Sequence, residues 1–147
     1  MSLIDHGHPV FSDQSGVYWI ASSVEVTEME QAAHQRNFRF VHLNGFGITN
    51  RADLFGMIQS AFEFPAHFGG NWDALLDMLR DLSWLPASGY IVFAHNLEPL
   101  SAYDHASYDH LLGVLHDATS FWAEQKHNRP PMIVLLTDVE SSGTKLS

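Results

Sequence analysis

The stretch HFGGNWDALLDMLRDL, residues 67–82, decides how the middle of this chain folds and what it exposes. Two glycines precede Asn71, a suitable N-cap because its side chain can accept a hydrogen bond from an amide of the first helical turn. Asp73, Asp77 and Asp81 recur every four residues and therefore share one exposed face of the predicted helix. A different face carries apolar residues at helical spacing and is expected to be buried: Trp72, Leu75, Leu76, Leu79 and Leu82.

The stripe of aspartates is not arranged for helix stability. Carboxylates one turn apart repel by a few tenths of a kcal/mol, and Arg80 can relieve only part of that repulsion. Only Asp73 lies in the first turn, where the helix dipole favours a negative charge. An ordinary solvated face and a docking surface for a basic partner both fit the pattern, and the mild self-repulsion is a hint of function.

The segment before the helix is rich in aromatic residues and glycine. Phe64, His67 and Phe68 lie within five residues of one another, and Gly69 and Gly70 let the backbone turn sharply. At least one of the two phenylalanines is expected to hold the segment against the core. His67 is the better candidate for exposure, so the segment extends the possible docking surface beyond the helix.

Composition narrows the classes of partner. Among 147 residues, seven Lys and Arg stand against seventeen Asp and Glu, which gives a formal net charge of -10. This charge argues against direct binding to nucleic acid or to an anionic membrane, and it fits a cationic partner or simple solubility. The absence of cysteine excludes disulfides, thiolate zinc sites and cysteine nucleophiles. Without a signal-peptide pattern or a membrane-length apolar run, we expect a cytoplasmic protein.

Apolar runs and breakers along the chain predict the element order β-α-β-α-α-β-α-β. The strands are expected at 17–20, 38–43, 90–94 and 132–136. The helices are expected from a capping box at Ser22 and Glu25 to about 35, from Asn50 to a stop at Pro65, at 71–82, and from Asp104 or Ser107 to before 130. Alternating strands and helices indicate an α/β protein with a small, mostly parallel sheet of about four strands, covered by helices.

The pattern aromatic-Gly-x-Asn-x-Asp-Ala-Leu-x-Asp, at residues 68–77, resembles the barstar family of intracellular inhibitors of the ribonuclease barnase. The segments 42–45 and 50–64 resemble the strand end and first helix of that family, and Trp84 stands where the family has a tryptophan after its binding helix. The resemblance covers Phe38 to Thr137. It implies one domain over residues 1–147, with a barstar-like core at 38–137.

The rest of the domain is assigned around this core. Residues 1–15 are expected to form a loose tail, and residues 138–147 a polar one. The strand and helix within 16–37 resemble an added unit of longer bacterial barstar-related proteins.

The resemblance also implies a mechanism. In the family, the binding helix plugs the basic active site of the ribonuclease, and its carboxylates stand in for substrate phosphate. Asp77 matches the dominant aspartate of the family and Asp73 its partner one turn earlier, while Asp117 lies where the family has a contacting glutamate. The other positions implied to contact the partner are His67, Gly69, Asn71, Trp72 and Trp84.

Three departures limit what can be carried over from the family. His67 replaces a tyrosine, Leu76 replaces an aromatic residue and Gly70 replaces an acidic one. The resemblance implies a barnase-like ribonuclease as partner and a role in toxin immunity. It does not imply a particular ribonuclease or an affinity.

No set of candidate catalytic, nucleotide-binding or metal-binding residues supports an enzyme as strongly as the family resemblance supports an inhibitor. Gly45-x-Gly47 lacks the third glycine of a dinucleotide fingerprint, and neighbouring His116 and Asp117 point in different directions on a helix. The histidines lack zinc-site spacing, and His42 and His95 are expected to be structural. We therefore expect no enzyme activity, cofactor or metal. The alternatives are an acidic module with a non-nuclease partner and, less favoured, a metal-assisted hydrolase using histidines and exposed aspartates.

Overall fold

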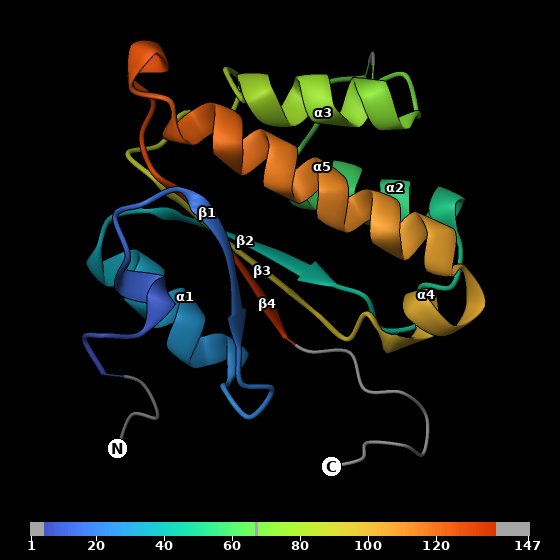
Figure 1. Ribbon diagram of the computed structural model, residues 1–147, viewed down its shortest axis with the longest axis horizontal. Coiled ribbons are helices and arrows are strands. Elements are labelled where there is room, and N and C mark those ends of the chain that lie inside the picture. The colour runs from blue at the N-terminus through green and yellow to red at the C-terminus, as the bar shows by residue number, and fades with distance from the viewer. Residues whose placement is uncertain (1–4, 67, 138–147) are drawn as a thin grey trace.

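A computed structural model describes residues 5–66 and 68–137 and shows one sheet between two layers of helices (Figure 1). Every strand pair in the sheet is parallel, and the strand order is β1-β4-β3-β2. The strands are β1 (Gly16–Ile20), β2 (Arg39–Asn44), β3 (Tyr90–His95) and β4 (Met132–Thr137). The predicted α/β class and small parallel sheet are confirmed.

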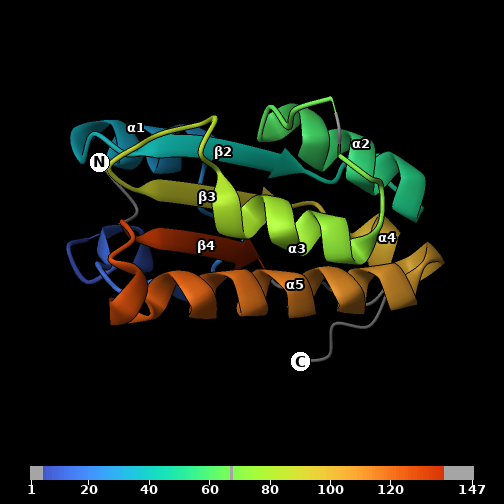
Figure 2. The same cartoon turned by 90° about the horizontal axis from the view of Figure 1, so that it is seen from above.

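Helices cover both faces of this sheet. The first α-helix lies on one face together with a short 3-10 helix, and the α-helices that follow it lie on the other face (Figures 1 and 2). The helices are α1 (Val26–Gln35), α2 (Arg51–Ala61), α3 (Trp72–Asp81), the short α4 (Glu98–Tyr103) and α5 (His105–Ala123). Two short 3-10 helices are η1 (Pro9–Phe11) and η2 (Gln125–His127).

The two central strands are apolar because helices cover both of their faces. Every residue of β4 is buried, as is every residue of β3 from Tyr90 to Ala94. Side chains alternate along β3, so Ile91 and Phe93 pack in the core under α1, while Tyr90, Val92 and Ala94 pack in the core on the opposite face. The larger of these two cores supports α3 and α5.

The segment before β1 differs from the loose tail expected over residues 1–15. Val10, in η1, is completely buried. Arg36 donates a hydrogen bond of 2.6 Å to the Val10 carbonyl and forms an ion pair of 2.7 Å with Asp13. β1 pairs in parallel with β4 and therefore covers an edge that β4 would otherwise expose. The polar tail expected at 138–147 lies outside the described residues.

Side-chain caps locate some helix starts and not others. α2 begins as predicted after Asn50, whose side chain accepts a hydrogen bond from the Asp53 amide at 2.8 Å. α5 begins after Asp104, whose carboxylate accepts hydrogen bonds from the amide and hydroxyl of Ser107. The capping box predicted at Ser22 is wrong, because α1 begins later and without a side-chain cap. The separate short helix α4 was not predicted.

Three half-buried histidines make the folded protein sensitive to acid. Burial lowers the pKa of His8, His42 and His95 below the ordinary value of 6.5. Carboxylates oppose this effect more weakly, with Glu30 raising the pKa of His42 and Glu98 raising that of His95. As the pH falls through 6.5, the unfolded chain therefore binds more protons than the folded one, and the free energy of unfolding decreases.

We expect a lower Tm at about pH 5.5 than at about pH 8. Thermal denaturation at the two pH values measures this difference. The variant His42→Gln should show a smaller decrease, whereas His116→Gln, at an exposed position of α5, should keep the full decrease. A wild-type Tm that is equal or higher at the acidic pH would contradict this account.

Candidate partner-binding surface

α3 lies side by side with α5 and is fixed to it (Figure 2). Leu75, Met78 and Leu79 form its buried face, while Trp72 and Leu76 of the predicted apolar face are only half-buried. Trp122 of α5 donates its indole N–H to the Leu79 carbonyl at 2.8 Å. Apolar burial and a buried hydrogen bond thus hold the helix, so the groups on its outer face have defined positions.

The outer face of α3 presents two carboxylates. Asp73 and Asp77 are exposed and lie one turn apart. Among the described residues, neither carboxylate has a hydrogen-bond or ion-pair partner, and the Arg80 guanidinium lies over the Phe121 ring at 5.2 Å. Asp81 differs, because its side chain accepts a hydrogen bond from the Ser83 amide at 3.3 Å. Two of the three predicted acidic groups are therefore free to meet an incoming cation.

The N-terminus of α3 is built as predicted at Asn71. Its side chain accepts a hydrogen bond from the Ala74 amide at 2.8 Å, which satisfies a free donor of the first turn. The left-handed backbone conformation falls at Gly70, with φ of +74°, and not at Gly69. Both glycines are exposed. His67 lies outside the described residues.

A continuous series of aromatic ring contacts holds the loop before α3 against the core. Trp84 meets Phe64 at 5.7 Å between ring centroids, Phe64 meets Phe68 at 5.0 Å, and Phe68 meets Phe55 at 5.8 Å. Phe55 and Trp72 then meet in a T-shaped arrangement, with ring centroids 4.8 Å apart. The expectation that a phenylalanine holds the loop against the core is confirmed, because Phe64 is buried and Phe68 packs on the core.

Trp84 has a structural part in this arrangement. Its indole N–H donates to the Phe62 carbonyl at 3.0 Å, just after the end of α2. The side chain is half-buried, so it ties the segment after α3 to the end of α2 while keeping part of its ring exposed.

Trp72 contacts His110, a residue that was not predicted to belong to the binding surface. Its ring stacks on His110 of α5, with centroids 4.7 Å apart and planes inclined by 17°. Trp72 is half-buried and His110 is exposed. The sequence carries no local signal for this contact, because the two residues are far apart in the chain and only the packing of α3 on α5 joins them.

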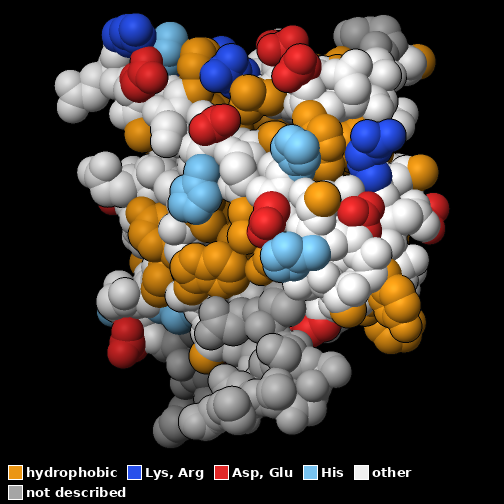
Figure 3. All heavy atoms as spheres, turned by 45° about the vertical axis from the view of Figure 1, so that its right-hand side comes forward, with side chains coloured by type: hydrophobic (Ala, Val, Ile, Leu, Met, Phe, Trp, Pro, Cys, Tyr) orange, Lys and Arg blue, Asp and Glu red, His pale blue; other side chains and the backbone are white. Residues whose placement is uncertain are grey.

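Asp117 lies on the side of α5 that faces α3. His110 meets Trp72 in the first turn of α3, and Phe121 meets Arg80 in its last turn, so the two helices run in the same direction. Asp117 follows His110 by two helical turns and therefore shares its stripe, at a level between these two contacts. It is exposed, and its negative charge adds to those of α3. On the face shown in Figure 3, acidic, basic and histidine side chains lie among exposed apolar groups.

The parallel α/β sheet thus carries a firmly packed helix, and this helix presents two exposed carboxylates beside aromatic rings. Neither carboxylate is paired within residues 5–66 and 68–137. The family model described as Barstar (barnase inhibitor) matches residues 38–136. The chain belongs to the barstar family. The match begins at the end of the strand–helix unit, so the segment containing β1 and α1 precedes it. No individually curated protein matches the chain.

Two kinds of feature are absent from the described residues. Within residues 5–66 and 68–137, no helix has the length and apolar character that a membrane span requires. In the same part of the chain, no three or more His, Asp or Glu side chains are grouped so that they could hold a metal ion.

Proposed function

We propose that this protein inhibits a barnase-like ribonuclease by inserting the outer face of α3 into its active site. The observation that carries the proposal is the pair of exposed carboxylates, Asp73 and Asp77, unpartnered among the described residues, in a chain of a family described as barnase inhibitors. An RNA-cleaving site must hold an anionic phosphodiester, so it offers cations that two carboxylates one turn apart can engage. The inhibitor thereby occupies the place of the substrate.

Rigid support makes the two carboxylates effective. Binding loses less entropy when the contacting groups are already held in place. Trp122 ties the last turn of α3 to α5, and the Asn71 cap completes its first turn. Both carboxylates are therefore presented on an ordered helix instead of a mobile loop.

The neighbouring residues complete the surface. Trp72 supplies aromatic area backed by Phe55 and His110, and Gly69 leaves room for close approach of the enzyme to the loop. Asp117 adds a negative charge from α5. His67 and Trp84 are proposed to supply further apolar area, and the net charge of -10 speeds encounter with a basic enzyme at low salt.

The biological role that follows is immunity to a toxic ribonuclease. A cell that makes such an enzyme, or meets one from a competitor, needs a cytoplasmic protein that blocks it. No cofactor or metal is part of this mechanism, because inhibition requires only occlusion of the active site and charge complementarity.

An inhibition titration tests the proposal. A barnase-like ribonuclease is mixed with increasing amounts of the tag-free full chain, and cleavage of a fluorogenic RNA is followed. RNA cleavage should fall linearly and vanish at equimolar inhibitor, as expected for a tight complex. A tenfold excess of the chain lies well above the equivalence point of a nanomolar complex. Full ribonuclease activity at about this excess would contradict the proposal. It would favour the alternative interpretation, an acidic module that binds a partner other than a nuclease.

A further inference from the structure

An aromatic stack joins the first turn of α3 to α5. The Trp72 indole lies nearly parallel to the His110 imidazole, with ring planes inclined by 17° and centroids 4.7 Å apart. Phe55 of α2 meets the same indole in a T-shaped arrangement. Trp72 is half-buried whereas His110 is exposed, so the imidazole forms the outer layer of the stack. A partner that reaches this end of α3 therefore meets His110 where the imidazole covers the indole.

The outer side of the His110 ring is available for a contact with another protein. Within residues 5–66 and 68–137, the imidazole has no hydrogen-bond or ion-pair partner, and its ring contact is the stack on Trp72. A flat ring that is stacked on one side and exposed on the other can accept a second flat group on its open side. Because Trp72 is itself packed against Phe55, the stack offers this side at a defined position.

The charges near this stack on α3 and α5 are negative. Asp73 lies in the first turn of α3, and Asp117 lies on the same stripe of α5 as His110. Asp109 precedes His110 in α5, and all three carboxylates are exposed. Arg80 lies in the last turn of α3, at the other end of the helix. An arginine guanidinium fits such a place, because it stacks flat on an aromatic ring and also pairs with carboxylates.

A position without a side chain follows His110 on the surface of α5. Gly113 lies one turn further along the helix and is exposed. In the described part of the chain, a Cβ atom added to Gly113 would meet no atom within 4 Å apart from its own helix backbone and adjacent residues. Glycine destabilises a helix interior relative to alanine, and no packing inside the molecule requires it here. It leaves the surface between His110 and Asp117 low, so another protein can approach α5 closely.

We propose that the ribonuclease-binding surface continues from α3 across His110 and Gly113 of α5, and that an arginine of the enzyme stacks on the outer side of the His110 imidazole. This inference rests on the proposed function, because it extends the same surface. The guanidinium lies flat on the ring and pairs with the carboxylate of Asp73 or Asp117, while the adjoining chain of the enzyme passes over Gly113. His110 thereby favours ribonucleases that carry an arginine at this place.

A matched pair of glycine variants tests the close approach to α5. Gly113→Gln places a side chain beside His110 and should raise the Kd of the complex about fivefold or more. Gly56 is likewise an exposed glycine inside a helix, α2, with open space where a Cβ atom would lie, so Gly56→Gln should bind like the wild type. Glutamine favours a helix more than glycine does, so both variants should keep the Tm of the wild type or exceed it. Equal Kd values for all three proteins would overturn the role of Gly113.

Double-mutant cycles test whether the group on His110 is an arginine. Each arginine on the active-site face of the ribonuclease is replaced by alanine, and each variant enzyme is titrated with the wild-type chain and with His110→Ala. For one of these enzymes the two chains should bind equally well, because the group that stacks on His110 is gone. If His110→Ala weakens binding by the same factor for every variant enzyme, the assignment to an arginine is wrong.

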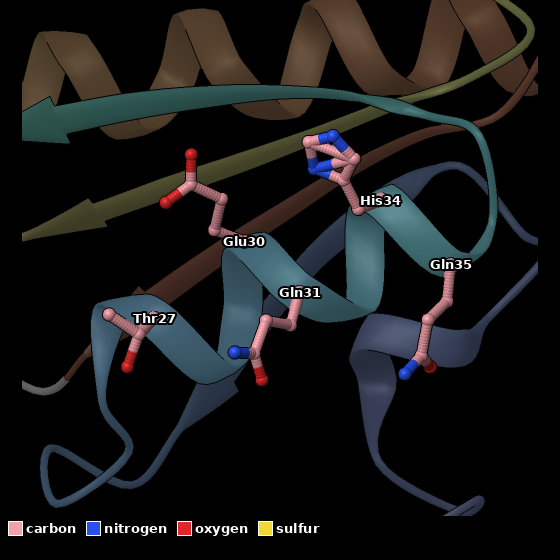
Figure 4. A pocket seen from close by; sticks show the side chains of 5 residues that line it. All are labelled: Thr27, Glu30, Gln31, His34 and Gln35. Carbon is pink, nitrogen blue, oxygen red and sulfur yellow. The ribbon is translucent and has the colours of Figure 1, made fainter.

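Calorimetric titration with the ribonuclease that the full chain inhibits tests the central contact. His110→Ala removes the ring and should raise the Kd about fivefold or more, whereas His110→Phe keeps a flat ring and should keep most of the affinity. His34→Ala is the matched control, because His34 is an exposed histidine of α1, on the opposite face of the sheet (Figures 1 and 4). Equal affinity of His110→Ala and an inhibiting wild type would overturn this inference alone. A wild type that inhibits no ribonuclease would overturn the proposed function, and this inference with it.

Discussion

Asp77→Ala is expected to weaken the complex with a barnase-like ribonuclease by at least ~2 kcal/mol, or about 30-fold in Kd. Asp77 lies in the middle of α3, where it is exposed and has no partner among the described residues. In the complex its carboxylate would be desolvated against cations of the enzyme. Removal of the carboxylate leaves those cations buried without a counter-charge, and this penalty makes the effect large. Calorimetry with the purified variant measures it.

Two variants control this measurement. Asp77→Asn keeps the size of the side chain and removes its charge, so it should lose most of the same affinity. Asp81→Ala removes a carboxylate that accepts a hydrogen bond from Ser83 at the C-terminal end of α3, and its affinity should change little. Because Asp73 and Asp77 repel each other, Asp77→Ala should leave Tm unchanged or slightly raised. Undiminished affinity in Asp77→Ala would contradict the mechanism even if the ribonuclease is inhibited.

Trp122→Ala is expected to lower the free energy of unfolding by about 3–5 kcal/mol, because it empties a large buried site. The Trp122 side chain is 3% exposed, meets Tyr90 edge-on at 5.3 Å and donates to the Leu79 carbonyl at 2.8 Å. The Arg129 guanidinium also lies over its ring at 4.9 Å. The substitution therefore removes apolar packing and the hydrogen bond that fixes the last turn of α3. Urea denaturation monitored by circular dichroism measures the loss.

Trp122→Phe separates the hydrogen bond from most of the packing. It keeps an aromatic ring but leaves the Leu79 carbonyl without its donor, at a cost of about 1–3 kcal/mol. Trp122→Phe should increase the rate of amide hydrogen exchange more in α3 than in β4, because α3 loses a direct contact. A Trp122→Phe protein as stable as the wild type, with unchanged exchange in α3, would show that the bond does not hold the helix.

Local patterns were enough to predict the elements that carry the proposed function. The N-cap of Asn71, the apolar spacing from Leu75 to Leu79 and the exposed positions of Asp73 and Asp77 all depend on residues within one helix. The same holds for β3 and β4, whose continuous apolar runs are typical of strands covered on both faces. Short-range chemistry therefore predicted both the scaffold and the acidic face.

Contacts between distant segments could not be predicted in this way. The stacking of Trp72 on His110 and the meeting of His42 with His95 both depend on how helices and strands are placed in space. Val10 and Phe11 form too short an apolar run to give a periodic signal, yet Val10 is buried by the packing of η1 on α1. The sequence predicted neither the contact of Trp72 with His110 nor that of His42 with His95.

A crystal structure of the complex with a barnase-like ribonuclease tests the central claim most directly. The account predicts that α3 fills the active site of the enzyme, with carboxylate oxygens of Asp73 and Asp77 within about 4 Å of Arg, Lys or His nitrogens of the ribonuclease. A complex in which the ribonuclease contacts α1 or the β2 edge, and both carboxylates remain in solvent, would contradict it.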